Sequence, residues 1–365
     1  MSMYRPLSQE ERAVIENEAN ERAVMERIRD GDEIGLRHLL EDRRVGHFLG
    51  IEGSLIGYET PLMACVYGRM SERGNDTVMR VMQLLLDHGA DINQVFWGKT
   101  VLGCAMFWNN VEIIEFLISH SANVNTVYDA KLNRTLLFSC STPRVVESLI
   151  RNGANVNTRD NERWSPLHYI ATKSRSGNAD DVARSFITKG ALLEARTLTG
   201  ATPLHLASTF GSSLVAIVLL QSGADVNAIF FQDGSTSLHI AARFGYKHIV
   251  RLLLSRGASM TALDRDGRTP WHACIAAHPV EMRETLDVLK AEATRRARYE
   301  AVAMGLEQPD SILHKFPNEL FRTLQQYGIE HDGHGSESRE GSESEGESDT
   351  ESDSESEGDH ENHTN

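Results

Sequence analysis

The apolar positions of this chain fall into two short phrases that return together at a regular interval. The first phrase, Thr-Pro-Leu-His-Leu-Ala, is clearest at 202–207, and the second, Leu-Leu-Gln-Ser-Gly-Ala-Asp-Val-Asn, follows it at 219–227. The Thr or Ser that begins each copy of the first phrase recurs about every 35 residues: Thr60, Thr100, Thr135, Ser165, Thr202, Thr236 and Thr269. Two coupled phrases in a fixed order indicate a repeat protein.

Each repeat predicts two short helices followed by a hairpin. Thr202 can cap a helix start through its hydroxyl, and Pro203 loses no hydrogen bond at the first helical position. A second helix over 214–222 has one apolar side and ends at Gly223, the residue type favoured where a helix stops in the left-handed conformation. One repeat cannot bury its own apolar faces, so consecutive repeats are expected to stack into a solenoid. The positions expected in the interior of this repeat are Leu204, Ala207, Val218 and Leu219.

The two ends of the repeat array are predicted to be capping units. Residues 9–29 predict a helix with Ser8 as its N-cap, and residues 31–40 match the second helix of a repeat. Residues 280–304 predict a long, charged helix, as a polar terminal cap requires. With these caps included, the sequence predicts about eight repeats.

Three repeats depart from the regular spacing. Residues 68–75 and 173–178 are predicted to be loops inserted between the two helices of their repeats. In the repeat that begins at Thr135, the first helix is predicted to be cut short at 141–143. The stacking is therefore expected to be least regular in that repeat.

Both phrases resemble those of ankyrin repeats, and the resemblance extends over about residues 22–304. It implies an all-α solenoid of stacked helix-turn-helix repeats with β-hairpin fingers. The family brings no catalytic site with it. The resemblance implies a non-enzymatic scaffold for protein–protein interaction, with the fingers and the first helices lining a concave binding surface.

The chain is predicted to have four parts. Residues 1–50 form a capping helix and a capping repeat, and residues 51–304 form the solenoid with its C-terminal cap helix. A short helical extension follows at 305–335, and a disordered acidic tail rich in Ser, Glu and Asp follows at 336–365.

Most of the net negative charge lies in the last thirty residues. The chain has a formal charge of −15, and residues 336–365, with twelve carboxylates and one arginine, carry −11 of it. The remainder is nearly neutral, which disfavours direct nucleic-acid binding. No apolar run reaches the roughly 18 residues that cross a membrane, and the first residues turn charged at once, unlike a secretory signal. Four cysteines without a Cys-x-x-Cys pair favour a cytoplasmic or nuclear protein.

The acidic tail is predicted to be a target for phosphorylation. Residues 330–365 contain no aliphatic residue and no Phe, Trp or Tyr, so this segment cannot form a core of its own. Seven hydroxyl residues each have an acidic residue three positions on, the pattern read by acidophilic kinases of the casein-kinase-2 type: Ser342, Ser344, Ser348, Thr350, Ser352, Ser354 and Ser356. Each phosphate would add about −1.5 to −2 charge. The tail is expected to modulate partner binding or to engage a basic protein; the alternative is a purely solubilising role.

A second function is suggested by residues 311–324. Their phrase Phe-Pro-Asn-Glu-Leu-Phe-Arg-Thr-Leu resembles the opening of an F-box, the module that docks substrate adaptors onto ubiquitin ligases. The segment is about half as long as that module. The alternative interpretation is a helix that covers the open end of the last repeat.

The sequence predicts neither an enzyme nor a cofactor or metal site. The phrases GxGxxG, GxxxxGK[ST], HExxH and GxSxG do not occur. Four histidines fill one position of the repeat and are therefore expected to be structural, bridging one hairpin to the next: His168, His205, His239 and His272. The four cysteines are expected to be small buried residues.

Aromatic residues at the hairpin tips and at the ends of first helices are the candidate partner contacts. A tip exposed to water normally carries Asp, Asn or Gly, whereas aromatic anchors dominate interface energetics. The candidates are Tyr58, Phe96, Trp97, Trp108, Trp164, Phe210, Phe231 and Phe244. Trp97, Trp164 and Phe231 are the three predicted contacts; the alternative is that such rings pack against the neighbouring finger.

Overall fold

The computed structural model describes residues 9–41, 60–67, 74–174, 177–277 and 283–303. All of them belong to the first of the two units, 1–313 and 314–365, into which the chain divides. The predictions for Ser8, Tyr58, the segment 305–335 and the acidic tail therefore lie outside the described residues.

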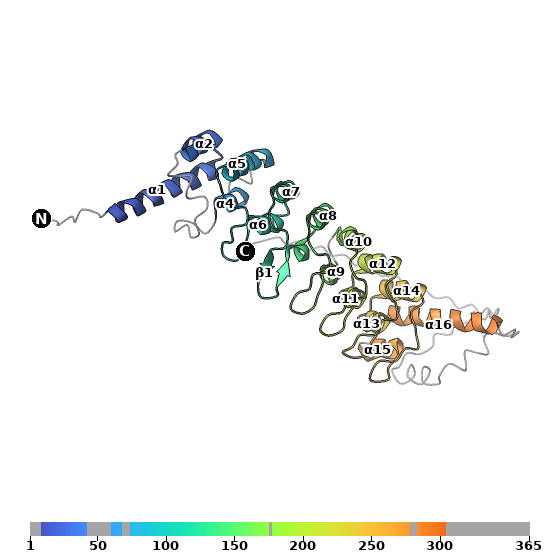
Figure 1. Ribbon diagram of the computed structural model, residues 1–365. Helices are drawn as coiled ribbons and strands as arrows, with labels where there is room; N and C mark the ends of the chain where they lie inside the picture. The colour runs from blue at the N-terminus through green and yellow to red at the C-terminus, as the bar shows by residue number, and fades with distance from the viewer. Residues whose placement is uncertain (1–8, 42–59, 68–73, 175–176, 278–282, 304–365) are drawn as a thin grey trace, which may run out of the picture. The chain divides into compact units, whose positions relative to one another are not determined.

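Along the described ranges the helices follow one another in pairs, a first helix and a second helix (Figure 1). The pairs are α1 (Gln9–Asp30) with α2 (Glu33–Glu41), α4 (Pro61–Val66) with α5 (Asn75–Asp87), α6 (Val101–Phe107) with α7 (Val111–Ser119), the 3-10 helix η3 (Leu136–Ser139) with α8 (Pro143–Arg151), α9 (Pro166–Ala171) with α10 (Ala179–Thr188), α11 (Pro203–Phe210) with α12 (Ser213–Gln221), α13 (Ser237–Arg243) with α14 (Lys247–Ser255), and α15 (Pro270–Ala277) with α16 (Arg283–Ala303). The strands β1 (Val127–Asp129) and β2 (Arg134–Thr135) pair antiparallel.

The helix pairs stack so that first helices pack on first helices and second helices pack on second helices. The first helices contact one another in chain order, α1 with α4, then α6, η3, α9, α11, α13 and α15. The second helices do the same, α2 with α5, then α7, α8, α10, α12, α14 and α16. Two parallel rows of helices, one inner and one outer, are the arrangement that the repeated phrases predict.

Helix starts follow the capping chemistry that the repeated Thr predicts. The hydroxyl of Thr202 accepts a hydrogen bond from the backbone N–H of His205, and Thr60 and Thr100 cap α4 and α6 in the same way. Gly223 follows the end of α12 with φ 93°, a conformation that costs a residue with a Cβ about 1–2 kcal/mol.

The predicted interior positions are confirmed. Leu204, Ala207, Val218 and Leu219 are each at most 1% exposed. The four cysteines are likewise buried, and burial raises the pKa of Cys274 to about 12. They therefore fill space as small hydrophobic residues.

The irregular repeat is shortened as predicted. Its first helix is the four-residue η3, and α8 begins at Pro143. The residue before a proline avoids the helical region, and Thr142 is extended at φ −133°, ψ 142°. The inner row of helices therefore has one short member between α6 and α9.

The two terminal helices match their predicted ranges closely. The helix α1 spans 22 residues and α16 spans 21, and both contain several acidic and several basic residues. In the part of the chain that the structure describes, no helix combines the length and the apolar character needed to cross a membrane.

Candidate partner-binding surface

Hairpin-like turns, here called fingers, precede the first helices at 94–99, 127–134, 159–164, 196–201, 229–235 and 263–268. Neighbouring fingers are joined by backbone hydrogen bonds, Asn161 N–H to Leu132 O (2.9 Å), Leu198 N–H to Glu162 O (3.0 Å) and Arg265 N–H to Asp233 O (2.9 Å). The fingers and the adjoining C-terminal ends of the first helices form what we call the finger surface. These three bonds order the fingers that they join.

The repeated histidines tie each first helix to the next finger. His205 Nδ1 accepts the backbone N–H of Thr202 at 3.1 Å, and its Nε2 lies 2.9 Å from the carbonyl oxygen of Ala228. An acceptor at Nδ1 and a donor at Nε2 define a neutral ring. Burial lowers the pKa of His168 and His205 to about 4 and also lowers that of His239. The bridging role predicted for these three histidines is confirmed.

Buried aspartates set the shape of two fingers. Asp160 Oδ1 accepts the backbone N–H groups of Glu162 and Trp164, and its Oδ2 accepts Arg134 Nε at 2.9 Å. Its side chain is fully buried. Asp264 makes the corresponding bonds in its own finger. Each carboxylate thus closes a finger and fixes the direction in which its tip points.

The predicted aromatic contacts differ widely in exposure. Trp97 is 77% exposed and Trp108 58%, whereas Phe231, Phe244 and Phe210 are about half exposed. Two rings are half-buried: Phe96, whose centroid lies 6.3 Å from that of Trp97, and Trp164, 6.3 Å from that of His168. Tyr58 lies outside the described residues. The finger surface therefore presents its most accessible rings around α6.

The finger tip at Trp97 has an unusual backbone. Phe96 and Lys99 exchange both backbone hydrogen bonds, at 2.9 and 3.0 Å, across a two-residue turn. Trp97 and Gly98 both have positive φ, 51° and 72°, as a type I′ turn requires. A left-handed residue other than glycine costs about 1–2 kcal/mol. Asn adopts positive φ at a lower free-energy cost than Trp does. The turn therefore holds an exposed indole in a strained backbone conformation.

Phe231 packs partly on the preceding finger. The guanidinium of Arg196 lies 4.2 Å from the centroid of its ring, and a Cβ on Gly200 would come within 2.5 Å of its atoms. For this ring the alternative interpretation, packing against a neighbouring finger, describes the contacts. Phe244 stacks on Tyr246 of its own repeat, with ring centroids 6.0 Å apart.

Sequence reasoning missed two parts of this surface. Phe107 is 76% exposed and lies edge-on to Trp108, with centroids 5.5 Å apart. Tyr169 on α9 holds Arg134 at 5.2 Å and Lys173 at 4.4 Å from its ring centroid. The late position of Phe107 in its helix, next to Trp108, is the signal that could have found it.

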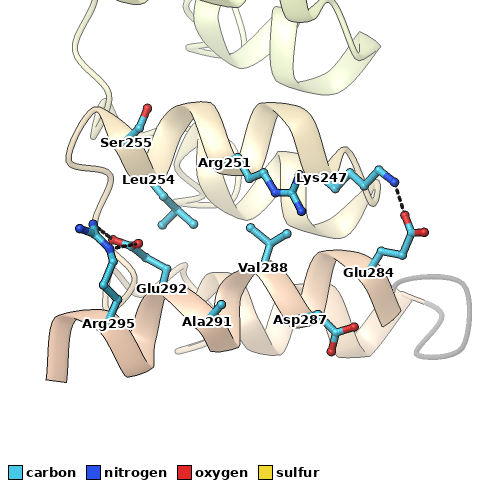
Figure 2. Close-up of a pocket in the computed structure, with 10 residues that line it drawn as sticks. All are labelled: Lys247, Arg251, Leu254, Ser255, Glu284, Asp287, Val288, Ala291, Glu292 and Arg295. Atoms are coloured by element: carbon cyan, nitrogen blue, oxygen red, sulfur yellow. Dashed lines mark hydrogen bonds and ion pairs between the residues drawn. The ribbon is translucent and has the colours of Figure 1, made fainter. Parts of the chain in front are cut away.

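A hollow of about 830 Å³ lies between the outer helices α14 and α16 (Figure 2). Its charged side chains are largely paired within it, Lys247 with Glu284, and Glu292 with Arg295 at 2.8 Å. Within the described ranges, no group of three or more His, Cys, Asp or Glu side chains could hold a metal ion. This groove offers no nucleophile–base pair.

The comparison with known protein families identifies the family to which this chain belongs. A family model described as ankyrin repeats (3 copies) matches residues 28–128, 136–230 and 228–295, which is more than half of the chain. The chain belongs to the ankyrin-repeat family. Members of this family are generally protein–protein interaction modules and typically non-enzymatic. No curated protein matches the chain.

Proposed function

We propose that this chain is a non-enzymatic scaffold that holds a protein partner on the finger surface, with Trp97, Phe107 and Trp108 as its anchors. The observation that carries the proposal is the exposure of these three rings, each more than half accessible, in a single repeat. The strained turn at Trp97 supports it, because strain in a native backbone concentrates at functional sites.

The finer architecture belongs to the same proposal. Each helix pair is taken as one repeat, eight in all with both caps, and residues 51–304 form the solenoid between the N-terminal cap and the extension at 305–335. The protein acts in the cytoplasm, the nucleus or both, on protein partners rather than on nucleic acid or membranes. It uses no cofactor.

Replacing the three anchors should weaken partner binding while leaving the fold intact. Trp97→Ala, Phe107→Ala and Trp108→Ala are each expected to cost at least about 1–2 kcal/mol of binding free energy, because exposed aromatic anchors carry most interface energy. Partners captured from lysate by the full chain and identified by mass spectrometry supply the ligand, whose Kd is then measured by calorimetry.

Trp164→Ala and Phe231→Ala provide matched controls. Both rings contact neighbouring residues of the fold, so their loss should lower the melting temperature more than that of Trp97→Ala does. Unchanged binding by all three anchor variants, at normal stability, would place the interface elsewhere.

We further propose that the tail at 336–365 modulates this binding through its charge. Its −11 charge predicts attraction to a basic partner, which weakens as salt screens charges beyond about 8–10 Å. Affinity should fall between low and physiological ionic strength, and phosphorylation of Ser342–Ser356 should raise it. A chain lacking 336–365 is the control: identical, salt-independent binding by both forms would leave only the solubilising role.

The adaptor hypothesis for residues 311–324 stays a prediction from sequence, since the segment lies outside the described residues. Capture by the full chain and by residues 1–304 separates it from the scaffold. Cullin-ligase components lost on truncation would support the adaptor, and their absence from both captures would count against it.

A further inference from the structure

One position of the repeat lacks its side chain in a single copy. The residue three places after the capping Thr or Ser points from the first helix toward the next finger, as the three bridging histidines show. The occupants of this position in chain order are Met63, Gly103, Phe138, His168, His205, His239 and His272. Of these seven residues, Gly103 alone has no side chain.

A cavity of about 110 Å³ lies beside Gly103. It is lined by the base of the next finger and by residues of α6 and its neighbours, among them Thr100, Phe107, Tyr67, Tyr128 and Leu136. A dry cavity of about 150 Å³ can hold benzene, so this smaller volume suits a five-membered ring. The cavity thus has the place and the approximate size of the imidazole found in other repeats.

Thr100, whose backbone N–H is the donor that the imidazole would use, lines the cavity. In the histidine repeats, the N–H groups of Thr202 and Thr236 donate to His Nδ1 at 3.1 Å. Thr100 is 3% exposed, and among the described residues its backbone N–H pairs with no acceptor. A buried donor without an acceptor costs about 1–3 kcal/mol of free energy. A ring nitrogen that accepts the hydrogen bond from this N–H would therefore bind favourably.

The cavity borders the finger surface. Lys99 and Phe107 both line it, and both are exposed. Phe107 is also one of the three proposed anchors, which places the cavity beside the proposed interface. A side chain of a bound protein can therefore reach the cavity beside that ring.

We propose that this cavity receives the neutral imidazole ring of a histidine from the protein partner. The ring takes the position that the chain's own histidine holds in the repeats beginning at Ser165, Thr202 and Thr236. Its unprotonated nitrogen accepts the Thr100 N–H, and its edge packs on Phe107 and Leu136. The inference rests on the proposed function only in that the ring belongs to the partner.

The test uses 4-methylimidazole, the side chain of histidine as a free molecule, with the full chain at a pH above the pKa of the probe. We expect saturable binding, followed by NMR shifts of the Thr100 and Gly103 amides, and at least tenfold weaker binding of toluene. Gly103→His should weaken binding of the probe at least tenfold and raise the melting temperature, because the new ring fills the cavity from inside.

Two variants keep the result independent of folding defects. A Cβ at Gly103 would lie 3.6 Å from Thr100 Oγ1 and 3.8 Å from Leu136 Cδ2, ordinary contact distances, so substitution is tolerated there. Gly103→Ala reports helix propensity alone, and it should retain more probe binding than Gly103→His. Gly103→Met places in the cavity the residue that Met63 supplies in the preceding repeat, and it should also exclude the probe.

Equal probe binding by the wild type, Gly103→His and Gly103→Met would overturn the proposal, as would toluene binding as tightly as 4-methylimidazole. The measurement needs no partner, so its failure leaves the finger surface as the proposed interface. Conversely, the three anchor variants could bind the partner normally while the wild type binds the probe. That result would contradict the proposed function but would leave the cavity as a site for an imidazole.

Discussion

Lowering the pH from 7 to 4 should destabilise the protein by roughly 6 kcal/mol through His168 and His205 alone. Burial holds the pKa of each ring at about 4 in the folded chain, below the ordinary histidine value of 6.5, so the unfolded chain binds more protons between these values. The stability that the neutral rings contribute is fully present above about pH 6.5 and is lost as the pH falls toward 4. At about 1.4 kcal/mol per pKa unit, each ring accounts for about 3 kcal/mol.

Urea unfolding curves between pH 4 and 7.5 measure this loss directly. His205→Gln removes one titrating ring, so its unfolding free energy should depend less steeply on pH than that of the wild type. The carboxylates with lowered pKa, such as Asp233 beside the Ser235 N–H, lose their contribution only below about pH 4. A flat profile from pH 7 to 4.5 would mean that the folded protein takes up protons on these rings as readily as the unfolded chain does, so that their pKa values are not lowered.

Asp160→Ala should cost about 3–5 kcal/mol of unfolding free energy. The substitution removes the acceptor of two backbone N–H groups and leaves the Arg134 guanidinium, only 16% exposed, without its carboxylate. Breaking a buried ion pair from one side strands the other charge in a poorly solvated site. Thermal and chemical unfolding of the variant give the value.

Asp266→Ala is the matched control for this substitution. Asp266 also pairs with an arginine of its finger, Arg268, but its side chain is 67% exposed, and exposed pairs contribute about 0–1 kcal/mol. If the two variants were destabilised equally, burial of the Asp160 carboxylate would not be what matters.

The sequence predicts the order and bounds of the helices well because local chemistry determines them. A Thr followed by Pro caps α4 and α11, Pro143 begins α8, and Gly223 follows the end of α12. The position at which each of these helices begins or ends depends on residues within a few positions of one another. The predicted range 9–29 accordingly differs by one residue from the observed α1.

The accessibility of the rings could not be predicted in the same way. Trp97 and Trp164 both stand near a finger tip, yet one is exposed and the other half-buried beside His168. Phe231 is partly covered by Arg196 and Gly200, which lie 35 and 31 positions earlier in the chain. Gly103 shows the same limit, since its missing side chain is visible in the sequence but the cavity requires Tyr67 and Tyr128 from two other repeats.

The hydrogen-bonded fingers bear on the thermodynamics of recognition. Backbone bonds from finger to finger and the histidine bridges order the fingers that they join, which lie between residues 127 and 268, when the chain folds. A flexible loop would lose conformational entropy at the moment of association, which lowers affinity for a given contact area. In these fingers that entropy has already been lost on folding, so a partner that binds them pays mainly for ordering its own residues. Differences in affinity among partners should consequently reside in how quickly each one dissociates rather than in how quickly it binds.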